Sequence, residues 1–272
     1  MGFIEKLTGA SRSNRSLLCV GLDTDPEMLP EGVSVLDFNK AIIEATCDLV
    51  CAYKPNLAFY EAMGSEGLDD LKRTVEAIPE GIPVIADAKR GDIGNTARAY
   101  ARALFDVYGF DAATVSPYLG YDSIEPFISY PDKGIFILCR TSNASAVDFQ
   151  SLEAEFENQK LPLYQIVAAR ASRWNSGGNI GLVVGATYPE ELQIIRQSYP
   201  DMPLLIPGVG AQGGDLAATV RYGVDARGEL AVINSSRQIL YASRGPDFAE
   251  AARQAALSLR DSINGYLSGE ER

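Results

Sequence analysis

Histidine is absent from this chain of 272 residues, and cysteine and tryptophan are scarce, with four residues and one. Without histidine there can be no Ser-His-Asp triad, no Cys-His pair and no zinc site with histidine ligands. Long apolar runs are also missing, so no segment approaches the length of a membrane span, and residues 1–11 lack the apolar centre of a signal peptide. We therefore expect a cytoplasmic protein.

Basic residues are few relative to acidic ones, 24 against 36, which gives a formal net charge of −12. Such a charge opposes general adhesion to nucleic acid or to an anionic membrane. The hydrophobic fraction of 46% is that of a globular protein and excludes wholesale disorder. Any anionic ligand must therefore be bound by a local concentration of donors.

The four cysteines, Cys19, Cys47, Cys51 and Cys139, lie inside apolar runs and do not form a closely spaced set. This distribution favours buried, reduced thiols over a metal or redox site.

Short apolar runs typical of strands alternate with segments of helical periodicity along the whole chain. Eight strands are predicted, at 17–23, 52–59, 83–89, 112–117, 134–140, 180–186, 203–209 and 230–236. Helices are predicted at 35–50, 68–78, 95–108, 162–174, 189–198, 213–223 and 248–267. Strands that alternate with single helices pair in parallel, with the helices outside.

Eight such units predict a (β/α)8 TIM barrel, an α/β fold with eight parallel strands and outer helices. An open doubly wound sheet is the alternative, but the first turn, GLDTDPEM, is not a dinucleotide-binding glycine loop. We expect one domain over residues 1–272, with a polar insertion at about 143–160 after the fifth strand. The active site of such a barrel lies at the carboxyl ends of its strands.

The third predicted strand ends in a charged cluster, DAKRGD at 87–92. Residues two apart on a strand point to the same face, so Asp87 and Lys89 should both face the barrel mouth. Asp92 follows a glycine that can fold the chain back. An ammonium held between two carboxylates stays charged, which suits a proton donor rather than a Schiff-base lysine. A purely structural ion-pair cluster is the alternative for these three residues.

Glycines are concentrated after the seventh predicted strand, in PGVGAQGGD at 207–215, and Arg237 follows the eighth. The loops after these two strands commonly bind phosphate in barrels of this kind. Glycines let backbone N–H groups approach an anion, Asp215 can cap the next helix, and Arg237 offers a fork of donors. A glycine-rich turn and a solvated arginine would explain either feature alone, but together they favour a phosphate site.

Two further polar residues belong to the predicted mouth by position. Lys54 lies on the second strand, where it could also snorkel or pair with Asp23. Ser142 follows the fifth strand, where it could also be a turn residue.

These residues together resemble the orotidine 5'-phosphate decarboxylase family, in its longer bacterial subgroup. The resemblance covers nearly the whole chain, from GLD at 21–23 through DAKRGDIGNT at 87–96 to PGVGAQGGD at 207–215 and Arg237. It implies decarboxylation of orotidine 5'-monophosphate to uridine 5'-monophosphate in pyrimidine biosynthesis, with no metal or organic cofactor. One departure is Ser235-Ser236 before Arg237, where many members have a glycine next to the arginine.

The resemblance also implies roles for the charged residues. Lys89 would protonate C6 of the pyrimidine after carbon dioxide has left, and Asp87 would lie against the substrate carboxylate. Lys54 and Asp23 would hold the ribose.

The remaining implied contacts involve the base, the phosphate and a second subunit. Ser142, or Thr141 if the alignment shifts by one residue, would contact the ring. Gln212 would link the ring to the phosphate, with Gly210 beside it and Arg237 gripping the phosphate. In this family the active site is shared across a homodimer, so that Asp92, Ile93 and Thr96 would reach the site of the partner.

Two other functions remain as alternatives. One is a magnesium-dependent sugar-phosphate decarboxylase or aldolase of the same barrel type, which would have an acidic residue where this chain has Lys54. The other is a barrel that binds a nucleotide or sugar phosphate without catalysis.

Overall fold

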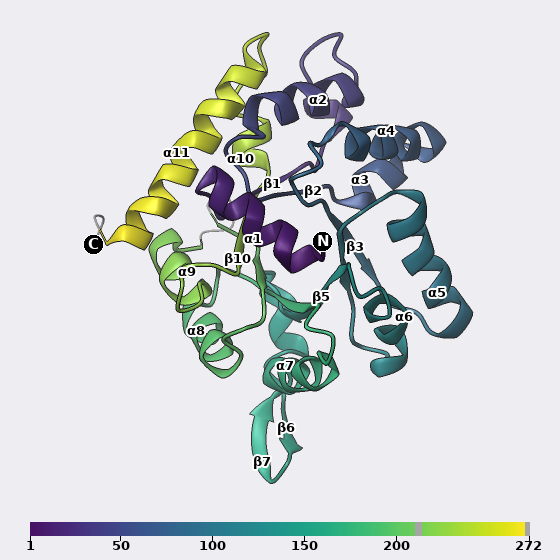
Figure 1. The fold of residues 1–272 in the computed structure, drawn as a ribbon, viewed down its shortest axis with the longest axis vertical. Helices are drawn as coiled ribbons and strands as arrows, with labels where there is room; N and C mark the ends of the chain where they lie inside the picture. The colour runs from purple at the N-terminus through teal and green to yellow at the C-terminus, as the bar shows by residue number, and fades with distance from the viewer. Residues whose placement is uncertain (210–213, 270–272) are drawn as a thin grey trace.

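The computed structural model describes residues 1–209 and 214–269 of the chain. Eight parallel strands form one sheet in the order β2-β1-β10-β9-β8-β5-β4-β3, with helices around it (Figure 1). The strands are β1 (Leu18–Gly21), β2 (Ala52–Lys54), β3 (Ile85–Arg90), β4 (Ala112–Val115), β5 (Gly134–Arg140), β8 (Ile180–Val184), β9 (Leu204–Ile206) and β10 (Ala231–Ser235). Each begins within two residues of its predicted start.

The two end strands of this order, β2 and β3, meet through isolated parallel bridges. The bridges pair Tyr53 with Val84 and Asn56 with Asp87, so the sheet curls into a nearly closed barrel. An open doubly wound sheet would leave these two strands far apart. The predicted TIM barrel is therefore confirmed.

Each predicted helical segment contains a helix in the structure. The described helices are α1 (Phe3–Asn14), α2 (Val35–Thr46), α3 (Leu57–Ala62), α4 (Gly64–Ala77), α5 (Gly94–Arg102), α6 (Glu125–Ile128), α7 (Leu163–Trp174), α8 (Pro189–Ser198), α9 (Leu216–Gly223), α10 (Arg237–Leu240) and α11 (Phe248–Ser268). Short turns are η1 (Pro26–Met28), the π-helical η2 (Ala103–Val107) that continues α5, η3 (Tyr121–Ser123) and η4 (Ala144–Asp148). No described helix is long and apolar enough to cross a membrane.

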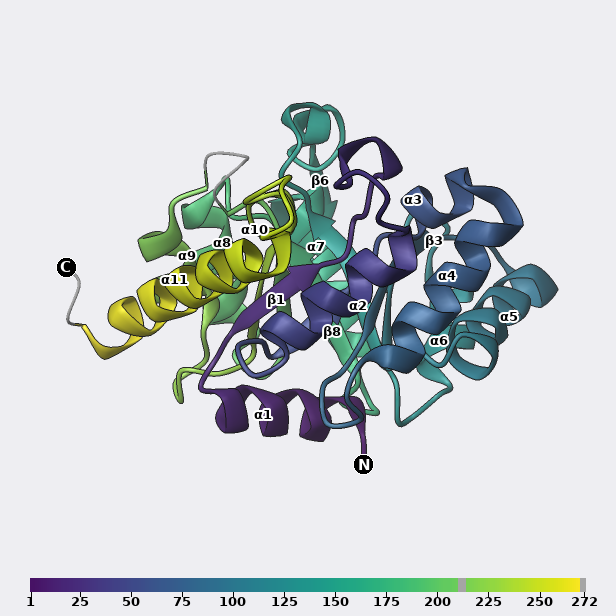
Figure 2. The ribbon, with the colours of Figure 1, turned by 90° about the horizontal axis from the view of Figure 1, so that it is seen from above.

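Helix α1, which the sequence analysis did not predict, lies across the amino-terminal end of the barrel (Figure 2). Its Phe3 and Leu7 are buried against inward-facing residues of the strands. The ring of Phe3 packs edge-on against Phe136 of β5, with the ring centroids 5.7 Å apart. This end of the barrel is therefore closed, and the opposite end, where the strands finish, is left for a ligand.

The predicted insertion at about 143–160 holds η4 and most of an antiparallel hairpin of β6 (Glu153–Phe156) and β7 (Gln159–Pro162), which ends two residues beyond the predicted boundary. The hairpin projects away from the barrel in Figure 1. The segment is less polar at its surface than expected, because Val147, Phe149 and Leu152 are exposed.

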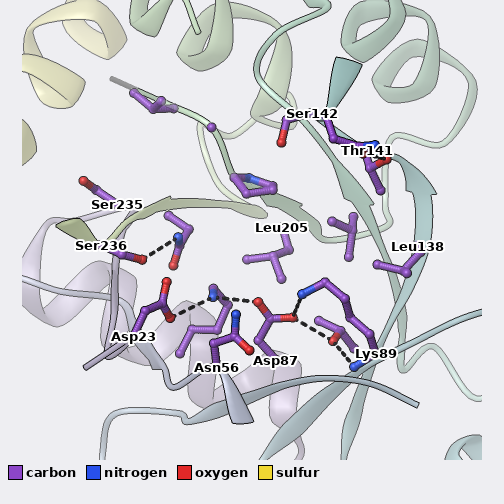
Figure 3. Close-up of a pocket in the computed structure, with 18 of the residues that line it drawn as sticks. Asp23, Asn56, Asp87, Lys89, Leu138, Thr141, Ser142, Leu205, Ser235 and Ser236 are labelled. Atoms are coloured by element: carbon purple, nitrogen blue, oxygen red, sulfur yellow. Dashed lines mark hydrogen bonds and ion pairs between the residues drawn. The ribbon is translucent and has the colours of Figure 1, made fainter. Parts of the chain in front are cut away.

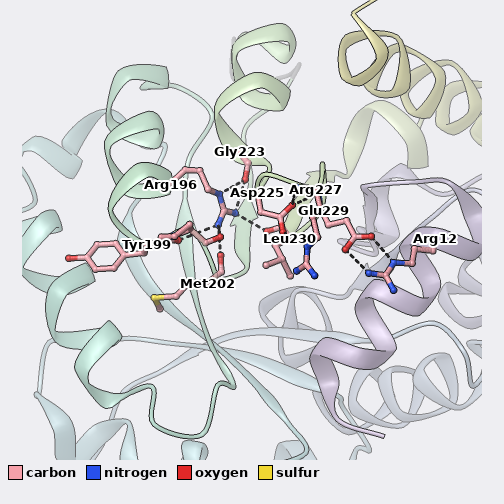
Figure 4. A network of polar contacts seen from close by, with 10 residues as sticks. Arg12, Arg196, Tyr199, Met202, Gly223, Asp225, Arg227, Glu229 and Leu230 are labelled. Atoms are coloured by element: carbon pink, nitrogen blue, oxygen red, sulfur yellow. Dashed lines mark hydrogen bonds and ion pairs between the residues drawn. The ribbon is translucent and has the colours of Figure 1, made fainter.

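A buried arginine ties several loops together at the amino-terminal side of β9 and β10 (Figure 4). The Arg196 guanidinium donates to the carbonyl oxygens of Tyr199, Pro200, Met202, Gly223 and Leu230. Burial lowers the pKa of Arg196 to about 10, only partly offset by Asp225 and Asp201, so the group remains charged at neutral pH. A lysine could not reproduce this planar fork of donors.

Candidate active site

A cavity of about 550 Å³ lies at the carboxyl ends of the strands. This volume is in the range of small-molecule sites. The predicted site residues that line it are Asp23, Lys54, Asp87, Lys89, Ser142 and Arg237. Its apolar floor includes Leu138, Val183 and Leu205, side chains of β5, β8 and β9.

Four charged side chains of the cavity form a row of alternating sign, of which Figure 3 labels Asp23, Asp87 and Lys89. Lys54 Nζ lies 3.0 Å from Asp87 Oδ2 and 3.8 Å from Asp23 Oδ1. Lys89 Nζ lies 2.6 Å from Asp87 Oδ1. The row thus runs Asp23, Lys54, Asp87, Lys89, with the charges of opposite sign next to each other.

The two lysines of the row differ in burial. The side chain of Lys54 is 4% exposed and that of Lys89 is 51% exposed. Burial lowers the pKa of Lys54, but the carboxylates of Asp23 and Asp87 outweigh it and raise the pKa above its usual value. Burial likewise raises the pKa of Asp87, but Lys54 and Lys89 outweigh it and lower the pKa. At neutral pH both groups are therefore ionised.

The expectation that Asp87 and Asp92 of one chain both hold Lys89 is wrong. Among the described residues, Asp87 is the carboxylate paired with Lys89. Asp92 lies outside the cavity, where its Oδ1 accepts a hydrogen bond from the N–H of Ile93. The chain leaves β3 after Arg90 and enters α5 at Gly94, so Asp92 lies in the connection between the two elements. The lysine held between two carboxylates of the same chain is Lys54.

Ile93 and Thr96 also lie outside the cavity, at the start of α5. Both side chains are exposed. A single chain therefore does not bring Asp92, Ile93 or Thr96 to the other site residues.

The wall formed by β5 and the insertion carries Thr141 and Ser142, which both face the cavity (Figure 3). Gly185 allows this loop to pack closely, since a Cβ there would lie 2.9 Å from the backbone of Ser142. Gln150 of the insertion accepts a hydrogen bond from the N–H of Thr141 and donates one to its hydroxyl, both at 2.8 Å. The insertion therefore helps to shape the cavity wall.

The predicted phosphate region follows β9 and β10. Arg237 begins α10 and lines the cavity, together with Gly208 of the glycine-rich loop. Asp215 caps α9 as predicted, because its Oδ1 accepts from the N–H of Ala218. Gly210 and Gln212, which the resemblance places here, lie outside the described residues.

Two buried acceptors at the cavity have no hydrogen-bond partner among the described residues. They are Asp23 Oδ1 and Asn234 Oδ1. Buried acceptors are normally hydrogen-bonded, so both are available to donors on a bound molecule.

The cysteines do not contribute to the cavity. Cys19, Cys51 and Cys139 are buried as predicted, whereas Cys47 is half-buried. Burial raises the pKa of Cys19 and of Cys139 to about 12, and raises that of Cys51 as well. At neutral pH these thiols are therefore protonated and unsuited to nucleophilic chemistry.

Polar residues of the cavity that the sequence did not single out include Asn56, Thr114, Gln150 and Gln238. Asn56 begins α3 and Thr114 lies on β4, both at strand ends where polar residues could have been considered. Gln150 gave no such signal, because it lies inside an insertion whose path depends on its contacts with β5.

The family model described as "Orotidine 5'-phosphate decarboxylase / HUMPS family" matches residues 16–255 of the chain. The chain is 60% identical to an orotidine 5'-phosphate decarboxylase of Dehalococcoides mccartyi (strain CBDB1), over 98% of both chains. It is 56% identical to the protein of that name from Herpetosiphon aurantiacus, over 93% of this chain and 95% of the other. Among solved structures, the OMP decarboxylase of Leishmania donovani matches with a TM-score of 0.85 and 42% identity, over 98% of this chain and 99% of that chain.

Proposed function

The chain belongs to the orotidine 5'-phosphate decarboxylase / HUMPS family, and from this premise we propose how its cavity works. The reaction is the decarboxylation of orotidine 5'-monophosphate to uridine 5'-monophosphate and carbon dioxide, a step of pyrimidine biosynthesis. The observation that carries the proposal is the alternating row of Asp23, Lys54, Asp87 and Lys89 at the carboxyl ends of the strands. This row places fixed charges and a proton donor, the ammonium of Lys89, next to each other in the cavity.

The chemical difficulty is the carbanion left at C6 when carbon dioxide departs, because no adjacent group can accept its electron pair. Lys89 donates a proton to C6, and its ammonium stabilises the negative charge as it develops. Asp87 lies against the substrate carboxylate and fixes the ammonium of Lys89, to which it is hydrogen-bonded. Lys54 holds Asp87 from the buried side.

The remainder of the substrate is bound around this row. The ribose hydroxyls donate to Asp23 and lie near Lys54. The buried Oδ1 of Asp23 lacks a hydrogen-bond partner among the described residues and lies 3.8 Å from Lys54 Nζ. Ser142 contacts the pyrimidine. Arg237 binds the phosphate together with the glycine-rich loop, including Gly210 and Gln212. Binding energy from this remote phosphate helps to position the reacting carbon.

The second carboxylate for Lys89 comes from a homodimer, in which Asp92 and Thr96 reach the cavity of the partner subunit and Ile93 lines it. Support comes from the surface around them. Ile93, Tyr118, Leu119 and Tyr121 are large apolar side chains exposed in the single chain. Exposed apolar groups of this kind are typical of a contact surface between proteins.

We further propose that the whole chain acts as one domain, in the cytoplasm, without a metal or organic cofactor. The position of Lys54 supports the last point. An ammonium between Asp23 and Asp87 already neutralises the carboxylates that a divalent cation would need.

An absorbance assay with orotidine 5'-monophosphate tests the reaction. Turnover should persist in excess chelator, and a loss of activity that magnesium restores would favour the metal-dependent sugar-phosphate enzyme instead. Absence of turnover with retained nucleotide binding would favour a barrel that only binds.

Replacement of Lys89 by alanine tests the acid. The Lys89→Ala variant should lose at least about 10²- to 10⁴-fold in kcat, the contribution typical of a general acid. It should still bind uridine 5'-monophosphate, measured by calorimetry. Near-normal turnover by this variant would remove Lys89 from the mechanism.

A further inference from the structure

We propose that Thr114 is a positioning residue, whose hydroxyl sets the geometry between Asp87 and Lys89. The inference rests on the proposed function for its kinetic consequence, but its structural basis is independent of the reaction. Thr114 lies on β4, beside the charged row, and its side chain is buried.

The pairing of β3 with β4 is interrupted where the charged residues lie. Ile85 pairs with Ala112 and Ala86 with Ala113, and the pairing resumes only at Arg90 and Val115. Residues 87–89 of β3 therefore face the single residue Thr114 of β4. This is a β-bulge, which bends a strand and redirects its side chains.

The bulge places Lys89 in an unfavourable backbone conformation. Its φ is +46°, in the left-handed region, where a lysine pays a steric cost of about 1 kcal/mol. A backbone of this kind persists only where neighbouring groups hold it. The hydrogen bonds of the β3–β4 ladder cannot hold the backbone of Lys89, because the ladder is interrupted between Ala86 and Arg90.

The hydroxyl of Thr114 takes the place of the missing ladder contacts. It accepts a hydrogen bond from the backbone N–H of Lys89 at 3.0 Å and donates one to Asp87 Oδ1 at 3.1 Å. The same carboxylate oxygen accepts from Lys89 Nζ at 2.6 Å. One hydroxyl thus joins the backbone of Lys89 to the carboxylate that holds its ammonium.

This closed arrangement matters because packing does not fix the lysine. The Lys89 side chain is half exposed and ends a flexible four-carbon stem. Thr114 fixes the amide nitrogen of Lys89 directly. Asp87 fixes the ammonium of Lys89, and Thr114 in turn orients Asp87. Branching at Cβ restricts the side-chain rotamers of Thr114, which makes it a suitable anchor.

Substitution of Thr114 by valine removes the hydroxyl and keeps the shape. The expected result is a fall in kcat of about 10- to 100-fold, since small misplacement of a reacting group has effects of this size. The KM for orotidine 5'-monophosphate and the affinity for uridine 5'-monophosphate should change by less than about threefold, because Thr114 is not assigned to substrate binding. Thr114→Ser keeps the hydroxyl and should recover most of kcat.

Amide hydrogen exchange measured by NMR gives a readout without substrate. The Lys89 amide should exchange faster in Thr114→Val than in the wild type and return toward the wild-type rate in Thr114→Ser. Thr46→Val is the matched control. Thr46 is a buried threonine of α2 whose hydroxyl donates to the Ile42 carbonyl and is hydrogen-bonded to the Tyr53 hydroxyl. Neither Thr46 nor Tyr53 lines the cavity, so kcat and Lys89 exchange should stay unchanged.

The outcomes separate this inference from the proposed function. If wild-type protein decarboxylates its substrate and Thr114→Val keeps full kcat, or if serine fails to restore it, the positioning role is wrong. If the wild type has no activity but Lys89 exchange responds as expected, the proposed function fails and the positioning role stands. Should Thr114→Val not fold, Thr114→Ala is expected to show the same changes, and its failure to do so overturns the inference.

Discussion

Lys54 and Lys89 share one carboxylate, but their surroundings give them different tasks. Lys54 is buried between Asp23 and Asp87, so its ammonium is fixed and its charge is needed by both neighbours. Lys89 is half exposed, and Asp87 is its one ion-pair partner within residues 1–209 and 214–269, which suits the proposed contact with a substrate. In the proposed mechanism, the first lysine holds the site together and the second transfers a proton.

This difference predicts unequal effects on stability. Lys54→Met leaves two carboxylates without their buried cation and should lower the free energy of unfolding by about 3 kcal/mol at pH 8. Lys89→Met, the matched control, removes a half-exposed pair and should cost about 1 kcal/mol or less. Urea unfolding measures both, and equal losses would contradict the assignment.

The pH dependence of the Lys54 effect follows from the shifts in pKa. Because the pKa of Asp87 is lowered on folding, its carboxylate stabilises the folded protein at pH values above the ordinary carboxyl pKa of about 3.9. This stabilisation is lost as the pH falls below that value and through the lowered pKa. Because the pKa of Lys54 is raised on folding, its ammonium stabilises the folded protein at pH values below the ordinary lysine pKa of about 10.4. This stabilisation is lost as the pH rises through the raised pKa.

Without Lys54, the pKa of Asp87 should rise. In the Lys54→Met variant, Asp87 should therefore be protonated at mildly acidic pH, which removes the cost of a buried carboxylate without its cation. The stability gap between wild type and variant should therefore be smaller at pH 5 than at pH 8. A gap that does not change with pH would show that Asp87 keeps its low pKa without Lys54.

At the scale of secondary-structure elements, the insertion after β5 is predicted to affect substrate affinity. Gln150→Ala removes two hydrogen bonds to Thr141, next to Ser142. The KM for orotidine 5'-monophosphate should rise about three- to tenfold, the effect of a hydrogen bond of ordinary strength. Gln159→Ala, on the exposed hairpin strand β7, is the control and should leave steady-state kinetics unchanged.

Helix α1 is predicted to act on stability alone. Phe3→Ala should lower the free energy of unfolding by about 3 kcal/mol, because it empties a buried site against Phe136. The kcat should stay the same, since α1 closes the end of the barrel opposite the cavity. Ser13→Ala, on the exposed face of α1, should change stability by less than about 0.5 kcal/mol. A fall in kcat for a folded Phe3→Ala protein would contradict this prediction, because it would show that packing under α1 affects the cavity at the other end of the barrel.

The elements differ in how far the sequence predicts them. Buried parallel strands are continuous apolar runs, so all eight were found from local pattern. Helix α1 did carry a signal, since Phe3, Leu7 and Ala10 have helical spacing and are buried. It was not predicted because it precedes the first strand and lies outside the strand–helix alternation. The bulge in β3 could not be predicted, because its hydrogen bond joins Lys89 to a hydroxyl of β4 that is 25 residues away in the sequence.

At the scale of the whole molecule, the site is predicted to need two subunits. Lys89 and Asp92 are separate within one chain, so the proposed dimer supplies Asp92 from the partner. Mixing an Asp92→Ala subunit with a Lys89→Ala subunit should create one intact site in each heterodimer and restore activity that neither parent has. Activity is measured after co-expression with two affinity tags. No recovery in a purified heterodimer would mean that each subunit works alone.

At position 89, the residue that best suits the left-handed backbone is not the residue that the proposed reaction needs. Glycine occupies this conformation without steric cost, so the chain accepts a penalty of about 1 kcal/mol to keep a lysine there. A laboratory screen for heat resistance or soluble expression alone should therefore tolerate Lys89→Gly and with it lose the enzyme, because the relieved steric cost offsets the lost pair with Asp87, which is worth about 1 kcal/mol or less. Engineering this barrel for robustness requires selection for growth without added uracil alongside any thermal challenge.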